Sequence, residues 1–321
     1  MIRPLLAALL LVVSAPAFAE ELTEQQLHVQ DQRLAAIADR IMAANASLCT
    51  RTMPITGLTL HSADQYSEGY ARSLFGSGPV ALALVLPGSP GERAGLRSGD
   101  ALVRIGGQPL AALTAPAEGH IRESAFDLLA RQPAGEPVSL IAQRGEEAIT
   151  ATFTAPPGCM VLVEILVGSG LIGRSDGHTI QISYPLAAMV DDDGLAVIFA
   201  HELAHVVLHH RARLEAAGVS KGLLGELGRN QQLNRQVEVE ADRMSAHLLA
   251  NAGYNPGIAP AFWRSATGRR AGGGLMRSTI YPSATARGDL IAGEVAHYLP
   301  TGGGPSWPGH LLELRDLPFA Q

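Results

Sequence analysis

The sequence has little charge of either sign and contains no basic cluster. Only 17% of its 321 residues are charged, and the formal net charge is -6 at pH 7. Nucleic acid is therefore not expected as a partner. Hydrophobic residues make up 47% of the chain, which argues against extensive disorder and allows a sizeable buried core. A chain of this length is long enough for two domains.

A long apolar run is also missing. The most apolar segment, Leu5 to Val13, is shorter than the ~20 residues that a membrane-spanning helix needs. It follows a single arginine and leads to Ala17-Phe18-Ala19, a small-x-small cleavage site, so residues 1–19 are predicted to be a secretory signal. No cysteine stands at the cleavage point, which argues against a lipid anchor. We therefore expect a soluble protein, secreted across the inner membrane into the periplasm, with no transmembrane segment; the oligomeric state stays open.

Cysteine is scarce, since Cys49 and Cys159 are the two that the chain contains. In an oxidising compartment, two cysteines favour one disulfide over a metal site. They stand just outside the two ends of a segment rich in Gly and Pro, residues 54–156, with short apolar runs that read as strands. Because the ends of an inserted domain usually lie close together, we predict that a Cys49–Cys159 disulfide closes its base.

Residues 85–110, VLPGSPGERAGLRSGDALVRIGGQPL, carry the most specific pattern of this segment. A strand, a Pro-Gly turn, a short helix and a second strand follow one another. The pattern resembles the PDZ domains of bacterial proteases, with matches at Pro87 to Pro90, Ala94 to Leu96, Gly99-Asp100 and Ile105 to Gly107. The alternative is a generic small β domain with glycine turns.

What the sequence does contain is a concentration of histidine in an apolar run, IFAHELAHVVLHH, at residues 198–210. The run is predicted to lie in one long helix over residues 191–218. On a helix, His201 and His205 share a face about 6 Å apart, a spacing that can grip one zinc ion. The neighbouring Glu202 can take a proton from water at that ion. The alternative is a set of core histidines satisfied by hydrogen bonds.

A catalytic zinc ion needs a third protein ligand and an open position. The pattern HExxHxxGxxH would provide a third histidine, but Leu208 and Arg211 occupy the glycine and histidine positions. That class of site is therefore excluded. A second predicted helix, which contains the sequence VEVEAD, offers carboxylates instead.

The helical wheel of this second helix separates its acidic residues. Glu238 and Asp242 flank an apolar stripe, so Glu238 can reach the metal and Asp242 can hydrogen-bond a ligating histidine. The opposite face, which is predicted to meet water, carries Gln236, Glu240, Arg243 and His247. His209 and His210 are not expected to bind the metal.

HELAH followed by Glu238 and Asp242 in an E-x-x-A-D arrangement resembles the CaaX-prenyl-protease-type (HtpX-like) zinc metallopeptidases, in particular soluble exported members with an inserted PDZ domain. The resemblance implies one Zn2+ per chain, held by His201, His205 and Glu238, with Glu202 as the general base. It also implies an α+β fold, in which a mostly helical zincin-type domain with a small sheet carries a PDZ-like β domain. The predicted order is an N-terminal peptidase helix at 20–50, the PDZ-like domain at 51–157 and the metallopeptidase domain at 158–321.

In that family, substrate adds as an extra strand to an edge strand ahead of the active helix. Here this strand would comprise Thr179, Ile180, Gln181, Ile182 and Ser183. The family often has a histidine before a proline near the C-terminus, where this chain has Tyr281, followed by Arg287. The Tyr281 hydroxyl and the Arg287 guanidinium could donate to the oxyanion that forms during hydrolysis. Alternatively, Tyr281 only packs at a turn.

These observations predict an exported zinc endopeptidase that cleaves protein or peptide substrates in envelope protein quality control, with a PDZ-like domain that binds substrate or regulates the site. The alternative function is a PDZ-bearing, chaperone-like scaffold whose metal site is structural or weakly active. A structural zinc site is usually closed by a fourth ligand, commonly cysteine. No cysteine lies near HELAH in the sequence, which favours the enzyme.

Overall fold

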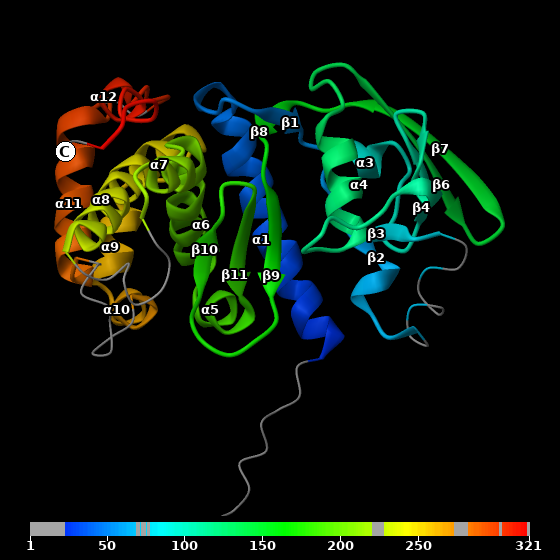
Figure 1. Ribbon diagram of the computed structural model, residues 1–321, viewed down its shortest axis with the longest axis horizontal. Coiled ribbons are helices and arrows are strands. Elements are labelled where there is room, and N and C mark those ends of the chain that lie inside the picture. The colour runs from blue at the N-terminus through cyan, green and yellow to red at the C-terminus, as the bar shows by residue number, and fades with distance from the viewer. Residues whose placement is uncertain are drawn as a thin grey trace, which may run out of the picture.

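The computed structural model describes residues 23–68, 71, 75, 78–219, 228–272, 282–301 and 304–319. The predicted signal segment, residues 1–19, and Tyr281 lie outside these ranges. The fold is mixed α+β, as the sequence predicted, with a helical part and a β-rich part built on separate hydrophobic cores (Figure 1). Within the described ranges, no helix is both long and apolar enough to cross a bilayer.

The helical part has a buried helix at its centre. Its helices are α1 (Glu24–Ala44), α5 (Tyr184–Met189), α6 (Asp192–Val207), α7 (His210–Ala216), α8 (Gly228–Asn251), α9 (Ile258–Arg264), α10 (Ala266–Ala271), α11 (Ala284–Tyr298) and α12 (Gly309–Leu312). α6 begins after Asp191, whose carboxylate accepts a hydrogen bond from the Gly194 amide. Because α6 is apolar on nearly all sides, it is covered by α1, α8 and α9.

The long helix predicted over residues 191–218 is broken into α6 and α7. His209 has a φ of 52° and a ψ of 32°, in the left-handed region that residues with a Cβ rarely adopt. α6 therefore ends at Val207, and the change of direction turns His210 back toward the end of α6. Gly218, with a φ of +72°, follows α7 where the sequence predicted a helix end.

A three-stranded sheet packs against α1 and α6. Its strands are β9 (Leu162–Leu166), β10 (Gly173–Ser175) and β11 (Thr179–Ser183), in the order β10-β11-β9. The prediction that residues 179–183 form an edge strand is therefore wrong, because β11 pairs antiparallel with β10 and parallel with β9. The sequence does not reveal β10, since the three residues Gly-Arg-Ser carry no apolar alternation.

The β-rich part is a sheet in the order β2-β3-β4-β6-β7, with β5 paired to β4. Its elements are β2 (Leu58–Ser62), β3 (Val80–Val85), α3 (Pro90–Arg93), β4 (Ala101–Ile105), β5 (Gln108–Pro109), α4 (Ile121–Ala130), β6 (Pro137–Arg144) and β7 (Glu147–Thr154). Short 3-10 turns lie at Ala46–Leu48, Ala63–Gln65 and Leu110–Ala112. α4 packs beside β2, an outer strand of this sheet within the described ranges.

A strand pair and a disulfide hold together the two ends of the β-rich part, at its base. β1 (Thr52–Pro54) and β8 (Pro157–Cys159) pair antiparallel where the chain enters and leaves it. A disulfide joins Cys49 to Cys159 across 110 residues, as the sequence predicted, with a Cα–Cα distance of 5.4 Å. In the chain-entropy account, closing a loop of that length stabilises the fold by about 4–5 kcal/mol.

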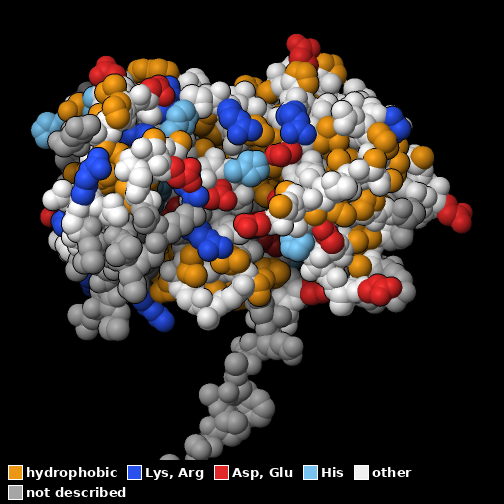
Figure 2. Space-filling view, viewed as in Figure 1, with side chains coloured by type: hydrophobic (Ala, Val, Ile, Leu, Met, Phe, Trp, Pro, Cys, Tyr) orange, Lys and Arg blue, Asp and Glu red, His pale blue; other side chains and the backbone are white. Residues whose placement is uncertain are grey.

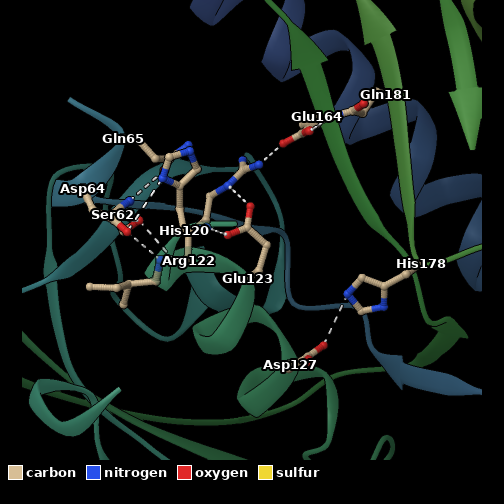
Figure 3. Close-up of polar contacts among 11 residues, drawn as sticks. Ser62, Asp64, Gln65, His120, Arg122, Glu123, Asp127, Glu164, His178 and Gln181 are labelled. Carbon is tan, nitrogen blue, oxygen red and sulfur yellow. Dashed lines mark hydrogen bonds and ion pairs between the residues drawn. The ribbon is translucent and has the colours of Figure 1, made fainter. Parts of the chain in front are cut away.

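The β-rich and helical parts also meet along α4 (Figure 3). Arg122 of α4 forms an ion pair with Glu164 of β9, and His178 Nε2 lies 3.5 Å from Asp127 Oδ1. The Phe126 ring packs edge-on against the His178 ring. Acidic and basic side chains are interspersed over the face on which both parts are visible (Figure 2). The two parts are therefore in direct contact beyond the β1–β8 pair.

Candidate metal centre

Helices α6 and α8 pack together at the centre of the helical part and place polar side chains in apolar surroundings. Residues 195–200 of α6 are all buried hydrophobic residues. His201 and Glu202, each 7% exposed, follow directly. Buried polar groups are costly unless they have partners, so the contacts of these side chains show what the cluster can hold.

Three side chains direct their ligand atoms at one point. His201 Nε2 lies 3.3 Å from His205 Nε2 and 3.2 Å from Glu238 Oε2. His205 Nε2 lies 3.7 Å from Glu238 Oε1. Two imidazole nitrogens and one carboxylate match the donor set of catalytic zinc sites, so these residues fit a zinc ion. The structure thus brings together the three residues that the sequence predicted as ligands.

His201 is held from behind by an anion. Its Nδ1 lies 3.1 Å from Asp242 Oδ1, to which it donates, and this leaves the Nε2 lone pair facing the point of convergence. Asp242 is fully buried and accepts from Arg287 Nε at 2.8 Å and from Arg287 Nη2 at 2.6 Å. Burial opposes ionisation of Asp242, but Arg287 and His201 outweigh burial and lower the pKa of Asp242 to about 2. The carboxylate therefore stays charged and fixes the His201 ring.

Arg287 reaches this pair from α11. Its guanidinium lies over the Trp263 ring, 3.5 Å from the centroid, and its Nη2 lies 3.2 Å from His201 Nδ1. These contacts support a role in positioning Asp242 and His201. The predicted donation from Arg287 to an oxyanion stays a prediction, as does that from Tyr281, which lies outside the described residues.

His205 is held from behind by residues that the sequence did not assign to the site. His210 Nδ1 lies 2.9 Å from His205 Nδ1, and His210 Nε2 lies 3.1 Å from Glu240 Oε2. One arrangement of protons satisfies both contacts: His205 donates from Nδ1 to His210, and His210 donates from Nε2 to Glu240. The Nε2 lone pair of His205 then faces the point of convergence. Arg213 Nη1 ends the row, 2.6 Å from Glu240 Oε2.

The prediction that Glu240 and His247 lie on a solvated face of α8 is wrong, because the two residues are only 3% and 0% exposed. A helical wheel shows the faces of one helix but not how many neighbours cover them. α8 packs against α6, α7 and α11, so more than one of its faces is covered. Burial opposes ionisation of Glu240, yet hydrogen bonds from His210, Arg213 and Gln236 lower its pKa to about 2. The feature of the sequence that could have indicated this contact is His210, the second histidine of the HH pair at residues 209–210.

Glu202 lies beside β10. A methyl group added to Gly173 of β10 would be 2.9 Å from Glu202 Oε1, so the β10 backbone runs against this carboxylate. Burial raises the pKa of Glu202 to about 7, against the opposing influence of His201. A carboxyl group with a pKa in this range is suited to accept a proton and return it.

Comparison with known proteins identifies the β-rich part. A family model described as PDZ domain matches residues 83–144, so the chain contains a PDZ domain there. Over 32 residues the chain is 72% identical to a Ralstonia nicotianae protein named "Putative zinc metalloprotease RSc1411". That match spans 10% of this chain and 7% of the Ralstonia protein.

Two solved structures are similar over a third of the chain. One is the HtrA-type protease AlgW with a decapeptide, 24% identical over 33% of this chain and 29% of that chain, with a TM-score of 0.26. The other is the HtrA3 PDZ domain bound to a phage-derived ligand, 18% identical over 33% of this chain and 89% of that chain, with a TM-score of 0.25. The chain spans less than a third of the length of the Ralstonia and AlgW proteins that it matches.

Proposed function

We propose that this chain is an exported, periplasmic zinc endopeptidase that cleaves protein or peptide substrates in envelope protein quality control. The observation that carries the proposal is the convergence of His201 Nε2, His205 Nε2 and the Glu238 carboxylate beside the buried Glu202. Each imidazole is oriented from behind by a contact at Nδ1, as is usual for histidines that bind metals.

The donor set favours an enzyme over a binding scaffold with a structural zinc site. Structural zinc sites are closed by four protein ligands, commonly cysteines. Among the described residues, the cluster of His201, His205 and Glu238 has three ligands, and Cys49 and Cys159 are joined to each other in a disulfide at the base of the PDZ insertion. A position for water or substrate therefore fits this donor set.

The side chains suit the hydrolysis of a peptide bond. Zinc held by His201, His205 and Glu238 would polarise the scissile carbonyl and lower the pKa of the attacking water. Glu202 takes the proton from that water and delivers it to the leaving amine. The contacts behind the two imidazoles keep their protons on Nδ1, so both Nε2 lone pairs stay directed at the centre.

β10 offers a place for an extended substrate. Within the described ranges it is an outer strand of the small sheet, and its Gly173 lies against Glu202. A peptide that paired with β10 would bring its backbone beside the base and would tolerate many side chains. β11, the strand expected from the sequence to bind substrate, lies one strand farther from Glu202.

The substitution Gly173→Ala is expected to lower kcat by up to ~10²-fold while zinc stays bound. The new methyl group would displace the Glu202 carboxylate, and misplacing a catalytic group by about 1 Å can have an effect of this size. Turnover of a protein substrate and zinc content by mass spectrometry check the prediction. Gly293→Ala is the control, because its added methyl meets nothing within 4 Å. An unchanged kcat in Gly173→Ala would contradict the placement of Glu202.

A row of polar side chains links the PDZ domain to β10. Arg122 of α4 donates to Glu164 of β9, and Glu164 accepts from Gln181 of β11 (Figure 3). Gln181 in turn accepts from Arg174 of β10 at 2.5 Å. The register of the sheet places Glu164 opposite Gln181 and Gln181 opposite Arg174, so the row crosses all three strands. It ends at Arg174, next to Gly173, where an added methyl group would meet the proposed base Glu202.

The other end of the row lies at the edge of the PDZ sheet. Ser62 Oγ, at the end of β2, accepts from the Arg122 amide at 3.1 Å, and Asp64 Oδ2 accepts from the Ile121 amide at 2.9 Å. PDZ domains bind extended peptides by adding a strand at a sheet edge, and β2 with α4 beside it provides such an edge. We propose that a peptide bound at β2 influences β10 through this row.

Arg122→Ala is expected to lower kcat/KM for protein substrates by ~5–150-fold, the usual range of coupling between two sites. Zinc content and the turnover of a short peptide that does not reach the PDZ domain should stay unchanged. Arg131→Ala, directly after the last residue of α4, is the matched control, because that side chain is 63% exposed and pairs with Asp127. Equal behaviour of the two variants toward protein substrates would refute the coupling.

The proposed activity is tested directly with the purified mature protein. Loaded with zinc, it is expected to cleave an unfolded protein such as reduced casein into peptides. A zinc chelator should stop cleavage, and added zinc should restore it. Intact casein after incubation with protein that has bound zinc would overturn the proposal and favour the scaffold.

A further inference from the structure

A second cluster of ligand-type side chains lies on α8, away from the proposed active site. His247 of α8, Glu294 of α11 and His310 of α12 each offer a ligand atom, all within 4.8 Å of one another. His247 follows Glu238 by nine residues, which corresponds to half a turn in excess of whole turns on an α-helix. The two clusters therefore occupy opposite faces of α8 and share no residue.

One carboxylate oxygen is the centre of this cluster. Glu294 Oε1 lies 3.0 Å from His247 Nε2 and 2.7 Å from His310 Nε2. The side chains of His247 and Glu294 are 1% and 2% exposed, whereas His310 is 28% exposed and leaves one side accessible. Two imidazole nitrogens and a carboxylate oxygen are the same donor set as at the first centre.

Neighbouring groups orient each member. His247 Nδ1 lies 2.6 Å from Ser306 Oγ, so this ring, like His201 and His205, has its Nδ1 occupied from behind. The other oxygen of Glu294, Oε2, accepts from Arg243 Nε at 2.6 Å, which turns Oε1 toward the histidines. The Tyr298 ring stacks on the His310 ring, with centroids 3.9 Å apart.

We propose that His247, Glu294 and His310 bind a second divalent transition ion, of which zinc is the natural probe. With His247 donating from Nδ1 to Ser306, its Nε2 lone pair faces the ionised Glu294 carboxylate, and a cation between them satisfies both. Water can complete the coordination on the accessible side of His310. The proposal stands on residues other than those of the proposed active site and does not depend on its activity.

Such an ion would hold the C-terminal segment, residues 310–319, against α8 and α11. His310 lies at the start of this segment, and Phe319 near its end lies against Leu233 and Val237 of α8. The Arg213 guanidinium lies 4.4 Å from the centroid of the Phe319 ring and also binds Glu240, whose carboxylate holds His210. The segment held at His310 therefore packs, through Phe319, on Arg213 at the end of the row that orients His205.

The test is the zinc content of the full mature chain, dialysed against zinc that is buffered at a low free concentration and measured by mass spectrometry. We expect two zinc ions per chain in the unsubstituted protein and one in His310→Gln. Glutamine keeps a hydrogen-bond donor for Glu294 but is a poor zinc ligand, so a network without metal would tolerate it. His297→Gln, an exposed histidine on α11, is the control and should keep both ions.

Each outcome decides between the two centres. One zinc ion in the unsubstituted chain that is lost in Glu238→Ala and kept in His310→Gln overturns the second site. Equal zinc content in the unsubstituted chain and His310→Gln overturns it as well. Zinc that is lost in His310→Gln but unaffected by Glu238→Ala supports the second site and contradicts the first. If His310→Gln does not fold, Glu238→Ala decides: one zinc ion retained by that variant supports the second site, and none refutes it.

Discussion

Glu202→Gln is expected to lower kcat by ~10²–10⁴-fold, the usual contribution of a general base, while zinc stays bound. Glutamine has the size of glutamate but cannot accept the proton of the attacking water. The ligand atoms of His201, His205 and Glu238 are untouched by the change. Steady-state turnover of an unfolded protein substrate and zinc content by mass spectrometry measure the two quantities separately.

The matched control is Glu215→Gln, which changes an exposed carboxylate of α7 that pairs with Arg211. Turnover by this variant should equal that of the unsubstituted chain. Wild-type turnover in Glu202→Gln would sink the assignment of the base, whatever the metal content. An inactive variant that still binds substrate also serves as a trap, and proteins retained by it in the periplasm would identify natural substrates.

Features coded by neighbouring residues could be predicted from the sequence. The spacing of His201 and His205 placed both on one face of α6, and the wheel of α8 placed Glu238 toward them. Asp191 caps α6, and Gly218, with a φ of +72°, follows α7, where the sequence predicted the start and the end of the helical stretch 191–218. These features depend on helical periodicity and backbone conformation, which short stretches of sequence determine.

Features that depend on which elements meet could not be predicted. Three-residue β10 exists because β11 and α6 flank it, and its own residues carry no pattern. The left-handed His209 is unfavourable by itself, but it brings His210 to His205, and a local propensity cannot express that gain. The burial of Glu240 and His247 likewise results from α7 and α11, which cover α8 on faces that a single-helix wheel leaves open.

The pair Glu238→Ala and Glu240→Ala is expected to separate metal binding from stability. Glu238→Ala removes a ligand, so zinc should be lost from the first centre while the fold persists. Glu240→Ala removes no ligand but leaves the buried Arg213 and His210 without their shared anion. Breaking a buried pair in this way typically costs about 3–5 kcal/mol of unfolding free energy.

Zinc affinity should also respond to Glu240→Ala, but less than to loss of the ligand. Without the carboxylate, His210 is no longer held against His205 Nδ1, and losing such support usually weakens metal binding by ~10–100-fold. Urea unfolding gives the stability and a zinc-binding titration gives the affinity for both variants. If Glu240→Ala releases zinc with unchanged stability while Glu238→Ala retains it, α8 faces the metal with its other side and the proposed ligand set is wrong.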